Sequence, residues 1–407
     1  MRIAYLHQYF NTPDMSGGTR SYEVARRFAE LGHEVHMVTT DRSGEAGSGW
    51  RETREAGFTA HWTPVPYSNR MNYAERVRAF FAFATRAGRR AASLRPDVVF
   101  ATSTPLTIAL PAVRAAKRRR VPMVLEIRDV WPRVPVALGA LHNPIARAAA
   151  ERLERYAYRH ADRIVAFAPG MRQWVVSQGY PAERAVVIPN GCDLRSFPAD
   201  PARAQAVRDT REWLDDRPMA LFAGTLGAVN GAGWLADVAA AAKAIDPGAL
   251  FVVMGDGRER DAIEAHARAL GVLGDTFHLL RARPKAEMPA WLTAATVSVS
   301  MLTGPECVYE DVGSNKIFDT MACGKPLVTN HTGWLADLLA CEGAGIVLDP
   351  GDVAGAAAAI CRCMRDAEWL ASAGAAARHL AEERFDRDEL AGQLERVLLD
   401  AVEEARR

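Results

Sequence analysis

The chain has 407 residues, of which 49% are hydrophobic and 24% are charged. This length exceeds one ordinary core and suits two α/β domains, and the composition excludes a disordered chain. Fifty Lys and Arg balance 49 Asp and Glu, so the net charge of +1 gives no global field that would favour nucleic acid.

Cysteine spacing and apolar runs exclude further classes of protein. No pair among the six cysteines has the spacing of a zinc site, and no apolar run is long enough to cross a bilayer. The opening residues are typical of a strand rather than of a signal peptide. Reduced thiols in a cytosolic enzyme are the simplest interpretation.

The first half predicts a doubly wound α/β domain. An apolar strand at 3–6 leads into a loop with Gly17 and Gly18, then a helical pattern, then a second strand at 34–38. Continuous apolar character is typical of parallel strands buried on both faces. It predicts further strands at 98–101, 123–127 and 163–166.

The second half repeats this plan. A strand at 219–223 precedes the loop 224–227, a helix at about 233–244 and a strand at 250–254, and further strands are predicted at 297–300 and 326–329. We therefore predict two Rossmann-like domains. Their expected bounds are 1–195 and 196–384, with a final helix, 385–407, that packs back toward the first domain.

A basic amphipathic pattern lies between Arg76 and Arg95. It places Phe83 among arginines on the face opposite an apolar stripe. A basic face with an exposed aromatic is typical of a membrane-surface helix, and a solvated arginine-rich helix with an ordinary core face is the alternative. The run 117–120 adds four cations to the same domain. The predicted apolar stripe consists of Val77, Phe80, Phe81, Ala84, Gly88 and Ala91.

Glycine clusters follow three predicted strands. Gly18 precedes a helix, Gly224 follows the first strand of the second half, and Gly255 and Gly257 follow the next strand. Glycine lets backbone approach a ligand, and a helix N-terminus attracts anions, so these edges are candidate phosphate sites. Structural turns explain each cluster individually, and the dinucleotide spacing G-x-G-x-x-G is absent from these loops.

Two charged segments could carry chemistry. Arg128 and Asp129 follow a strand directly, either as catalytic groups or as a salt bridge that closes the loop. Lys316 and Asp319 are three residues apart and share a helix face. Lys316 could neutralise a leaving diphosphate and Asp319 could bind ribose hydroxyls, whereas a surface Lys–Asp pair is the alternative.

The order of these segments resembles the retaining glycosyltransferases of family 4, which have the GT-B fold. The resemblance spans nearly the whole chain, and its Arg128–Pro132 and Ser314–Phe318 pieces are similar to the branch that builds bacterial O-antigens, capsules and exopolysaccharides. The other matching pieces are the opening strand with Gly17 and Gly18, and residues 31–35, 188–193, 254–257 and 319–326.

The resemblance implies site residues. Arg128, Asp129 and Lys316 are the expected catalytic residues. The expected donor-binding residues are Gly17, Gly18, Gly224, Thr225, Asn230, Gly255, Asp256, Gly257, Asp311, Ser314, Asn315 and Asp319.

The chain also departs from the family. Asp311 and Asp319 stand where the family often has glutamates, and Thr225 and Asn230 stand where it often has a basic pair. Arg128 replaces the usual histidine. We therefore expect Lys316, with Arg128 and helix N-termini, to neutralise the phosphates.

The resemblance implies an activity. We expect retaining, metal-independent transfer from a nucleotide-sugar, a UDP-sugar, to a lipid-linked acceptor, without a cofactor and with no nucleic-acid partner. The expected location is the cytoplasm, at the inner face of the membrane, in surface polysaccharide or glycoconjugate synthesis. A nucleotide-sugar epimerase and a non-catalytic sugar-nucleotide-binding subunit are the alternatives, and a nicotinamide dehydrogenase is disfavoured by the missing fingerprint.

Overall fold

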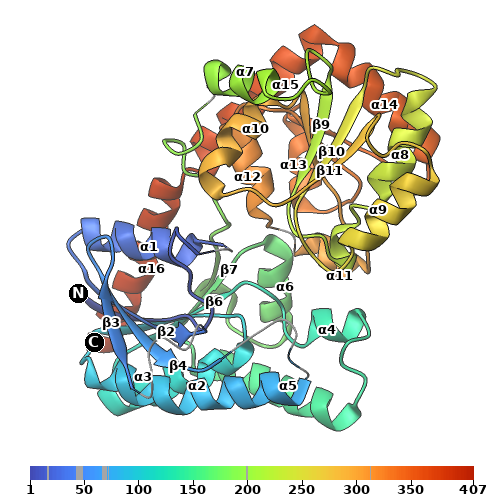
Figure 1. The fold of residues 1–407 in the computed structure, drawn as a ribbon. Helices are drawn as coiled ribbons and strands as arrows, with labels where there is room; N and C mark the ends of the chain where they lie inside the picture. The colour runs from blue at the N-terminus through green and yellow to red at the C-terminus, as the bar shows by residue number, and fades with distance from the viewer. Residues whose placement is uncertain (16–17, 43–48, 67–70, 72, 199, 312) are drawn as a thin grey trace. The chain divides into compact units, whose positions relative to one another are not determined.

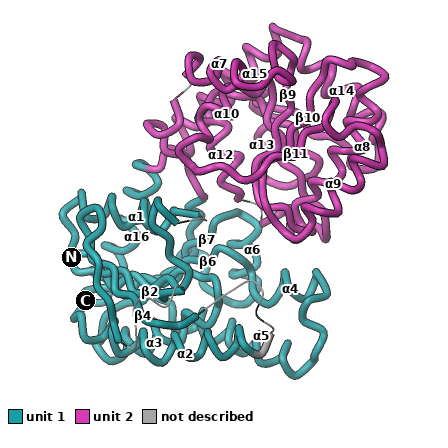
Figure 2. The backbone as a smooth tube through the Cα atoms, in the orientation of Figure 1, with its two compact units in different colours: residues 1–189, 388–407 teal, residues 190–387 magenta. Residues whose placement is uncertain are grey.

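The computed structural model describes residues 1–407 except 16–17, 43–48, 67–70, 72, 199 and 312, and gives only the backbone of residues 73 and 74. The chain forms two compact units. Unit 1 comprises residues 1–189 and 388–407, and unit 2 comprises residues 190–387 (Figure 2). The bounds expected from the sequence were residues 195 and 384.

Unit 1 is built on an eight-stranded sheet of order β3-β4-β2-β1-β5-β6-β7-β8. All neighbouring strands are parallel except β3, which pairs antiparallel with β4. The strands are β1 Arg2–Leu6, β2 Glu34–Asp41, β3 Arg51–Arg54, β4 Thr59–Pro64, β5 Val98–Thr102, β6 Met123–Ile127, β7 Arg163–Ala166 and β8 Ala185–Val187. The five strands predicted for this half are all present.

Helices cover both faces of this sheet (Figure 1). On one face, Phe28 of α1 packs with Leu394 and Leu398 of α16, so the C-terminal helix completes the core of unit 1. On the other face lie α2, α3 and α5, with α3 in contact with both of the others. The helices are α1 Arg20–Glu30, α2 Tyr73–Ser93, α3 Ala109–Arg119, α4 Arg133–Ala137, α5 Pro144–His160, α6 Pro169–Ser177 and α16 Arg387–Arg406, with short 3-10 turns at Leu106–Ile108 and Ala182–Arg184.

Unit 2 has a parallel six-stranded sheet of order β11-β10-β9-β12-β13-β14. The strands are β9 Met219–Ala223, β10 Leu250–Met254, β11 Phe277–Leu280, β12 Val297–Ser300, β13 Leu327–Thr329 and β14 Gly345–Val347. The helices are α7 Pro201–Asp209, α8 Trp234–Lys243, α9 Arg260–Ala269, α10 Met288–Ala294, α11 Glu306–Glu310, α12 Asn315–Ala322, α13 Trp334–Cys341, α14 Val353–Arg365 and α15 Ala367–Arg384, with 3-10 turns at Ala228–Asn230 and Lys285–Glu287. Alternate residues of β9 enter two separate buried clusters, Leu221 in one and Phe222 in the other, so helices bury both faces of the sheet.

The apolar stripe predicted for α2 is partly wrong. Phe83 is 1% exposed, whereas Phe81 is 50% exposed and shares the outer face with the arginines. The buried side follows small residues, because a side chain at Gly88 would come within 3.2 Å of Pro111 on α3. The basic face therefore carries an exposed aromatic, but that residue is Phe81. In the described ranges, no helix is both long and apolar enough to cross a bilayer.

Candidate functional site

Two glycine loops meet at the carboxyl edge of the sheet in unit 2. A Cβ on Gly255 would lie 1.9 Å from the carbonyl oxygen of Gly224, and one on Gly257 would lie 2.1 Å from that of Leu226. The Leu226 N–H donates to the Asp256 carbonyl at 3.0 Å and fixes the two loops together. These glycines are therefore required by the packing of the loops that follow β9 and β10, because any side chain there would clash with the neighbouring backbone.

Lys316 lies beside this edge, in the first turn of α12. Its Nζ is 4.1 Å from the centroid of the Phe222 ring, and its Cδ lies next to Gly224. Burial lowers the pKa of Lys316 to about 7, and no carboxylate in the described part of the chain pairs with this ammonium. A desolvated cation without a protein counter-ion is suited to an anionic ligand.

The start of α12 adds to the positive potential. Ser314 is the N-cap residue, but its side chain accepts no hydrogen bond from the first turn. N–H groups at a helix N-terminus and the helix dipole favour anions. Lys316 and the N-terminus of α12 are therefore a candidate anion site.

Asp319 lies one turn further along α12. Its Oδ1 is buried and accepts no hydrogen bond from the described residues. Burial raises the pKa of this carboxyl, with a contribution from Asp193, while Lys285 and Arg387 lower it. Lys316 and Asp319 form no ion pair in the described structure, so the surface-pair interpretation is wrong. Asp319 instead presents a free acceptor to a hydroxyl-bearing ligand.

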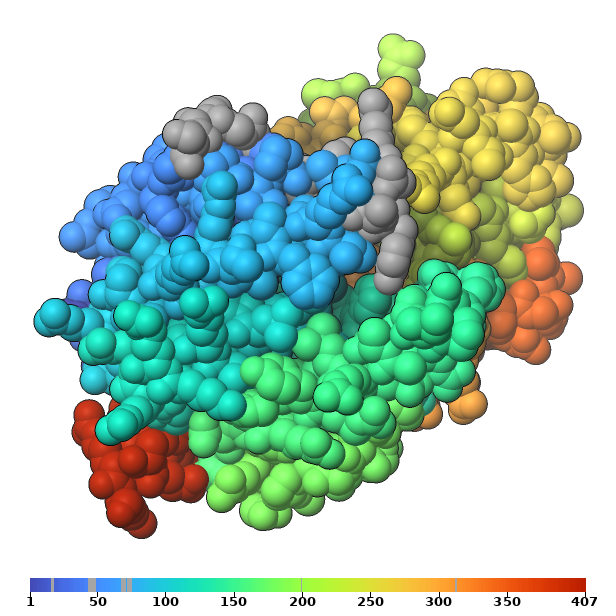
Figure 3. Space-filling model, turned by 90° about the horizontal axis from the view of Figure 1, so that it is seen from below, coloured from blue at the N-terminus to red at the C-terminus, as the bar shows by residue number. Residues whose placement is uncertain are grey.

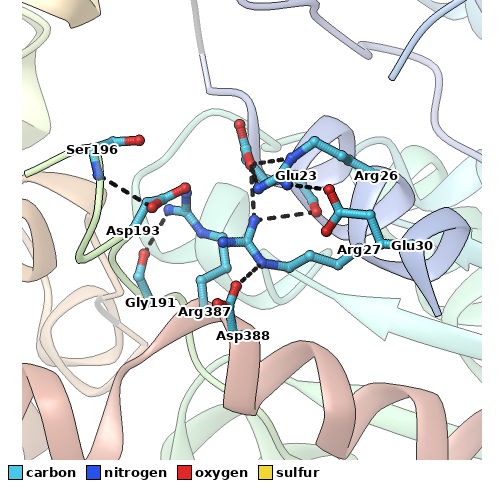
Figure 4. Close-up of polar contacts among 9 residues, drawn as sticks. All are labelled: Glu23, Arg26, Arg27, Glu30, Gly191, Asp193, Ser196, Arg387 and Asp388. Carbon is cyan, nitrogen blue, oxygen red and sulfur yellow. Dashed lines mark hydrogen bonds and ion pairs between the residues drawn. The ribbon is translucent and has the colours of Figure 1, made fainter. Parts of the chain in front are cut away.

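Asp193 and Arg387, near the two ends of unit 2, are close enough to Asp319 to affect its pKa. The Arg387 guanidinium donates to the Gly191 carbonyl at 2.7 Å, and Asp193 accepts from the Ser196 N–H at 3.3 Å (Figure 4). The Asn190 amide donates to the Gly313 carbonyl at 2.5 Å, just before α12. These contacts hold the start of unit 2 against the loop that precedes Lys316.

In unit 1, Arg128 lies at the carboxyl end of β6 beside His7, which follows β1. Arg128 Nη1 is 3.4 Å from His7 Nε2, and the Arg128 guanidinium lies 5.5 Å from the Phe167 ring centroid. Burial and then the charges of Arg128 and Arg42 lower the pKa of His7 well below its usual value. His7 is therefore a neutral imidazole next to a fixed cation.

Asp129 does not pair with Arg128. Its Oδ2 accepts a hydrogen bond from the Thr104 hydroxyl at 2.6 Å, and the Arg128 N–H donates to the Ser103 hydroxyl at 3.1 Å. The loop after β6 is thus held by the loop after β5. The interpretation of a loop-closing Arg128–Asp129 salt bridge is wrong in the described structure.

A buried ion pair fixes the start of α1. Arg20 Nη2 lies 2.9 Å from Glu126 Oε1, and both side chains are almost fully buried. Arg20 also donates to the Pro189 carbonyl at 3.0 Å, and the Gly18 carbonyl accepts from the Asn11 amide at 3.3 Å. Gly18 therefore belongs to an anchored loop.

Comparison with known proteins identifies both units. Residues 17–191 match the model of the glycosyl transferase 4-like domain, and residues 217–366 match that of glycosyl transferases group 1. The chain carries the two domains of a GT-B glycosyltransferase. This assignment confirms the predicted fold and the coarse family resemblance.

Individual relatives are distant. A 2-deoxystreptamine glucosyltransferase from Streptomyces kanamyceticus is 30% identical over 237 residues, which cover 57% of this chain and 59% of that enzyme, less than two thirds of its length. A GDP-mannose-dependent alpha-(1-6)-phosphatidylinositol monomannoside mannosyltransferase from Mycolicibacterium smegmatis is 25% identical over 70% of this chain and 71% of that enzyme. Anabaena Alr3699/HepE in complex with UDP has the same fold, with a TM-score of 0.75, 18% identity, and 98% of this chain and 100% of that chain covered.

Other predicted donor residues of the glycosyltransferase lie in different surroundings. Thr225 is exposed, Asn230 ends the 3-10 turn 228–230, and Asn315 begins α12. Arg281 donates a hydrogen bond to the Asp256 carboxylate at 3.1 Å. Desolvation raises the pKa of this carboxyl, but the hydrogen bonds from the Ala282 N–H and from Arg281 outweigh it, so the pKa is lowered. Asp311 is buried at the C-cap of α11. Gly17 lies outside the described residues.

The sequence interpretation assigned no role to His7, Asn190, Asp193, His331 or Arg387. His331 stacks on Tyr309 at 5.8 Å, and burial, with a contribution from the Lys316 charge, lowers its pKa. The available signal was the position of His7 directly after β1 and of His331 two residues after the end of β13. Within the described ranges, no cluster of three or more His, Cys, Asp or Glu side chains is arranged to hold a metal ion.

Proposed function

We propose that the chain transfers a sugar from a UDP-sugar to an acceptor hydroxyl with retention of configuration. One observation carries this proposal. A single helix of the glycosyltransferase group 1 domain holds both the Lys316 ammonium, which has no protein counter-ion, and an Asp319 carboxylate oxygen, which has no hydrogen bond in the described structure. The ammonium would bind the diphosphate, and Asp319 would accept hydrogen bonds from the ribose hydroxyls. Two matched transferase domains favour this activity over an epimerase or a non-catalytic subunit.

The proposed chemistry needs charge stabilisation more than a protein base. As the sugar–phosphate bond breaks, negative charge grows on the leaving diphosphate, and Lys316 with the N-terminus of α12 stabilises it. The acceptor hydroxyl attacks from the same face of the sugar, and a leaving phosphate oxygen takes its proton. Because fixed protein cations supply the positive charge, we propose that the reaction requires neither a divalent metal nor a cofactor.

We further propose a lipid-linked acceptor, in bacterial surface polysaccharide or glycoconjugate synthesis at the inner face of the membrane. The relative from Mycolicibacterium smegmatis is named for a lipid acceptor, phosphatidylinositol monomannoside. In this chain, α2 exposes Phe81 between Arg78 and Arg86, as a helix at a lipid surface does.

The donor proposal predicts a nucleotide-selective thermal shift that depends on Asp319. A ligand that binds only the folded state stabilises it by about 2.7 kcal/mol at 100 times its Kd. Among UDP-, GDP-, ADP- and dTDP-sugars we expect the UDP class to raise Tm by several degrees. Asp319→Ala should abolish the shift, and Asp275→Ala, which removes an exposed carboxylate paired with Lys243, should retain it. An equal response of wild type and Asp319→Ala, or no response to any donor, would contradict the assignment.

Donor affinity should also fall as pH rises above about 7. At higher pH the free site holds a neutral amine, because burial lowers the pKa of Lys316 to about 7, and donor binding must then take up a proton. The predicted loss approaches tenfold in Kd per pH unit over the range in which only the bound state is protonated. Titration calorimetry of a UDP-sugar, whose diphosphate is fully ionised there, measures both Kd and proton uptake. Lys316→Arg should bind with little dependence on pH, and a flat wild-type profile would contradict the prediction.

A further inference from the structure

One buried histidine of unit 2 has a ring nitrogen without a hydrogen-bond partner. His331 is 3% exposed, and its Nε2 bonds no group in the described part of the chain. Side chains at the molecular surface, such as those of the helices α2, α3 and α5 that face the viewer in Figure 3, have water available as a partner. A buried polar atom has given up that water, so an unpaired one needs an explanation of its own. The proposed transfer chemistry does not yet use this nitrogen.

The proton on the His331 ring is placed by a neighbouring carbonyl group. Nδ1 lies 2.8 Å from the Thr332 carbonyl oxygen, and because a carbonyl can only accept, Nδ1 carries the proton. In the neutral ring, Nε2 then has a lone pair and no hydrogen, so it can only accept a hydrogen bond. Burial and the nearby charge of Lys316 lower the pKa of His331, which keeps the ring neutral.

The loop after β13 holds this ring in place. The His331 ring stacks on Tyr309 of α11, with centroids 5.8 Å apart and planes inclined by 25°. Asn330 Oδ1 accepts from the Leu302 N–H at 2.8 Å, which ties the loop to the segment after β12. At Gly333, a Cβ would lie 2.4 Å from the Tyr309 carbonyl oxygen, so the loop passes directly against α11. The acceptor is therefore fixed before a ligand binds.

Further unpaired hydroxyls lie at the same edge of the sheet. Ser300 and Thr329 end β12 and β13 and stand opposite each other in the parallel register, and their buried hydroxyl oxygens have no partner in the described structure. Thr320 of α12 donates to Ser298 at 3.0 Å, so α12 covers the face of β12 that Ser298 shares with Ser300. Since a crossover helix runs antiparallel to its strands, Lys316, one turn before Thr320, lies toward their carboxyl ends. Unpaired polar groups therefore share this edge with Lys316, as expected where a polar ligand binds.

We propose that His331 Nε2 accepts a hydrogen bond from a hydroxyl of the transferred sugar, next to the position where Lys316 binds the diphosphate. An ionised phosphate has no proton to donate to Nε2, and the Lys316 ammonium suits it instead. A sugar hydroxyl has such a proton. This inference rests on the proposed function, because it requires a nucleotide-sugar donor, and it adds the residue that recognises the sugar. A site built to bond a hydroxyl rejects a sugar that lacks it, because the buried acceptor is then left unpaired.

Titration calorimetry with UDP, UDP-glucose, UDP-galactose and UDP-N-acetylglucosamine tests this assignment. His331→Phe keeps a ring to stack on Tyr309 but removes the acceptor. It should weaken binding of the preferred UDP-sugar about tenfold and leave the Kd of UDP unchanged. His331→Gln places an amide oxygen near the position of Nε2 and should recover part of the loss. The matched control is His278→Phe, at a buried histidine that stacks on Trp213 at 3.8 Å and whose Nε2 already contacts the Asp275 carbonyl, and it should bind both ligands like wild type.

Monofluoro analogues of the preferred UDP-sugar identify the hydroxyl and the direction of the bond. Fluorine cannot donate, so fluorine in place of the recognised hydroxyl should weaken binding to wild type about tenfold and barely change binding to His331→Phe. The assignment is overturned if His331→Phe weakens UDP as much as the UDP-sugar, weakens neither, or responds to every analogue as wild type does. UDP that fails to bind wild type, or binds Asp319→Ala equally well, would overturn the donor site itself. The two proposals therefore fail separately.

Discussion

Lys316→Met is expected to reduce turnover by about 100- to 1000-fold without lowering the melting temperature. The reason is that the Lys316 ammonium is desolvated beside Phe222 and has no protein carboxylate to neutralise in the described structure. Removing it takes away transition-state charge stabilisation but relieves a buried charge that costs folding free energy. A lysine with a purely structural role would show the opposite pattern, a loss of stability with turnover unchanged.

The measurement is UDP release from a UDP-sugar at saturating donor, which needs no identified acceptor. Lys316→Arg keeps the charge and should recover part of the lost turnover. The matched control is Lys325→Met, because Lys325 is also a half-buried lysine of unit 2 whose pKa is lowered by burial. If Lys316→Met and Lys325→Met release UDP at similar rates, Lys316 does not stabilise the leaving diphosphate.

Nine of the fourteen described strands could be predicted because each contains a short, continuous apolar run, whereas β3, β4, β8, β11 and β14 were not predicted. The antiparallel edge strand β3 could not, because its sequence Arg51–Arg54 is entirely polar and its side chains alternate between half-buried and exposed. Such a segment becomes a strand only when β4 offers its hydrogen-bonding edge. Tertiary context therefore decided this element, as is common for edge strands.

The exposed face of α2 shows a second limit of prediction from the sequence. Hydrophobicity alone placed Phe81 on the buried stripe, because the large aromatic side chain dominates the pattern. The helix packs closely against α3 through Gly88, which the predicted stripe already contained, so small residues rather than the aromatics decide which side is buried. This packing leaves Phe83 buried and Phe81 exposed.

Some residues of the candidate site could be predicted from the sequence and others could not. Lys316 and Asp319 could be predicted from one segment, since their spacing and the helix start are local features. His7 and Arg128 could not be predicted as a pair, because their contact joins residues 121 positions apart and depends on the order of β1, β5 and β6 in the sheet. Arg387 likewise reaches Gly191 only because the chain returns to the start of unit 2.

The same dependence on distant contacts makes Arg20 the residue of unit 1 whose loss should cost most stability. Arg20→Met should lower the free energy of unfolding by about 3–5 kcal/mol, because it leaves the Glu126 carboxylate buried without its cation. Arg20 also bonds the Pro189 carbonyl and lies 4.2 Å from the Phe167 ring centroid. Urea denaturation, with hydrogen exchange of β1, β5 and β6 peptides to report unit 1, measures the change.

The double variant separates the buried charge from lost packing. In Arg20→Met/Glu126→Gln, the neutral glutamine still offers an oxygen to the Thr102 hydroxyl, which donates to Glu126 at 2.5 Å in the wild type. Most of the lost stability should therefore return. Arg147→Met, which breaks the exposed Arg147–Glu151 pair of α5, should cost about 1 kcal/mol or less. A double variant as unstable as Arg20→Met would show that packing of the Arg20 side chain, rather than compensation of the Glu126 charge, fixes α1 to the sheet.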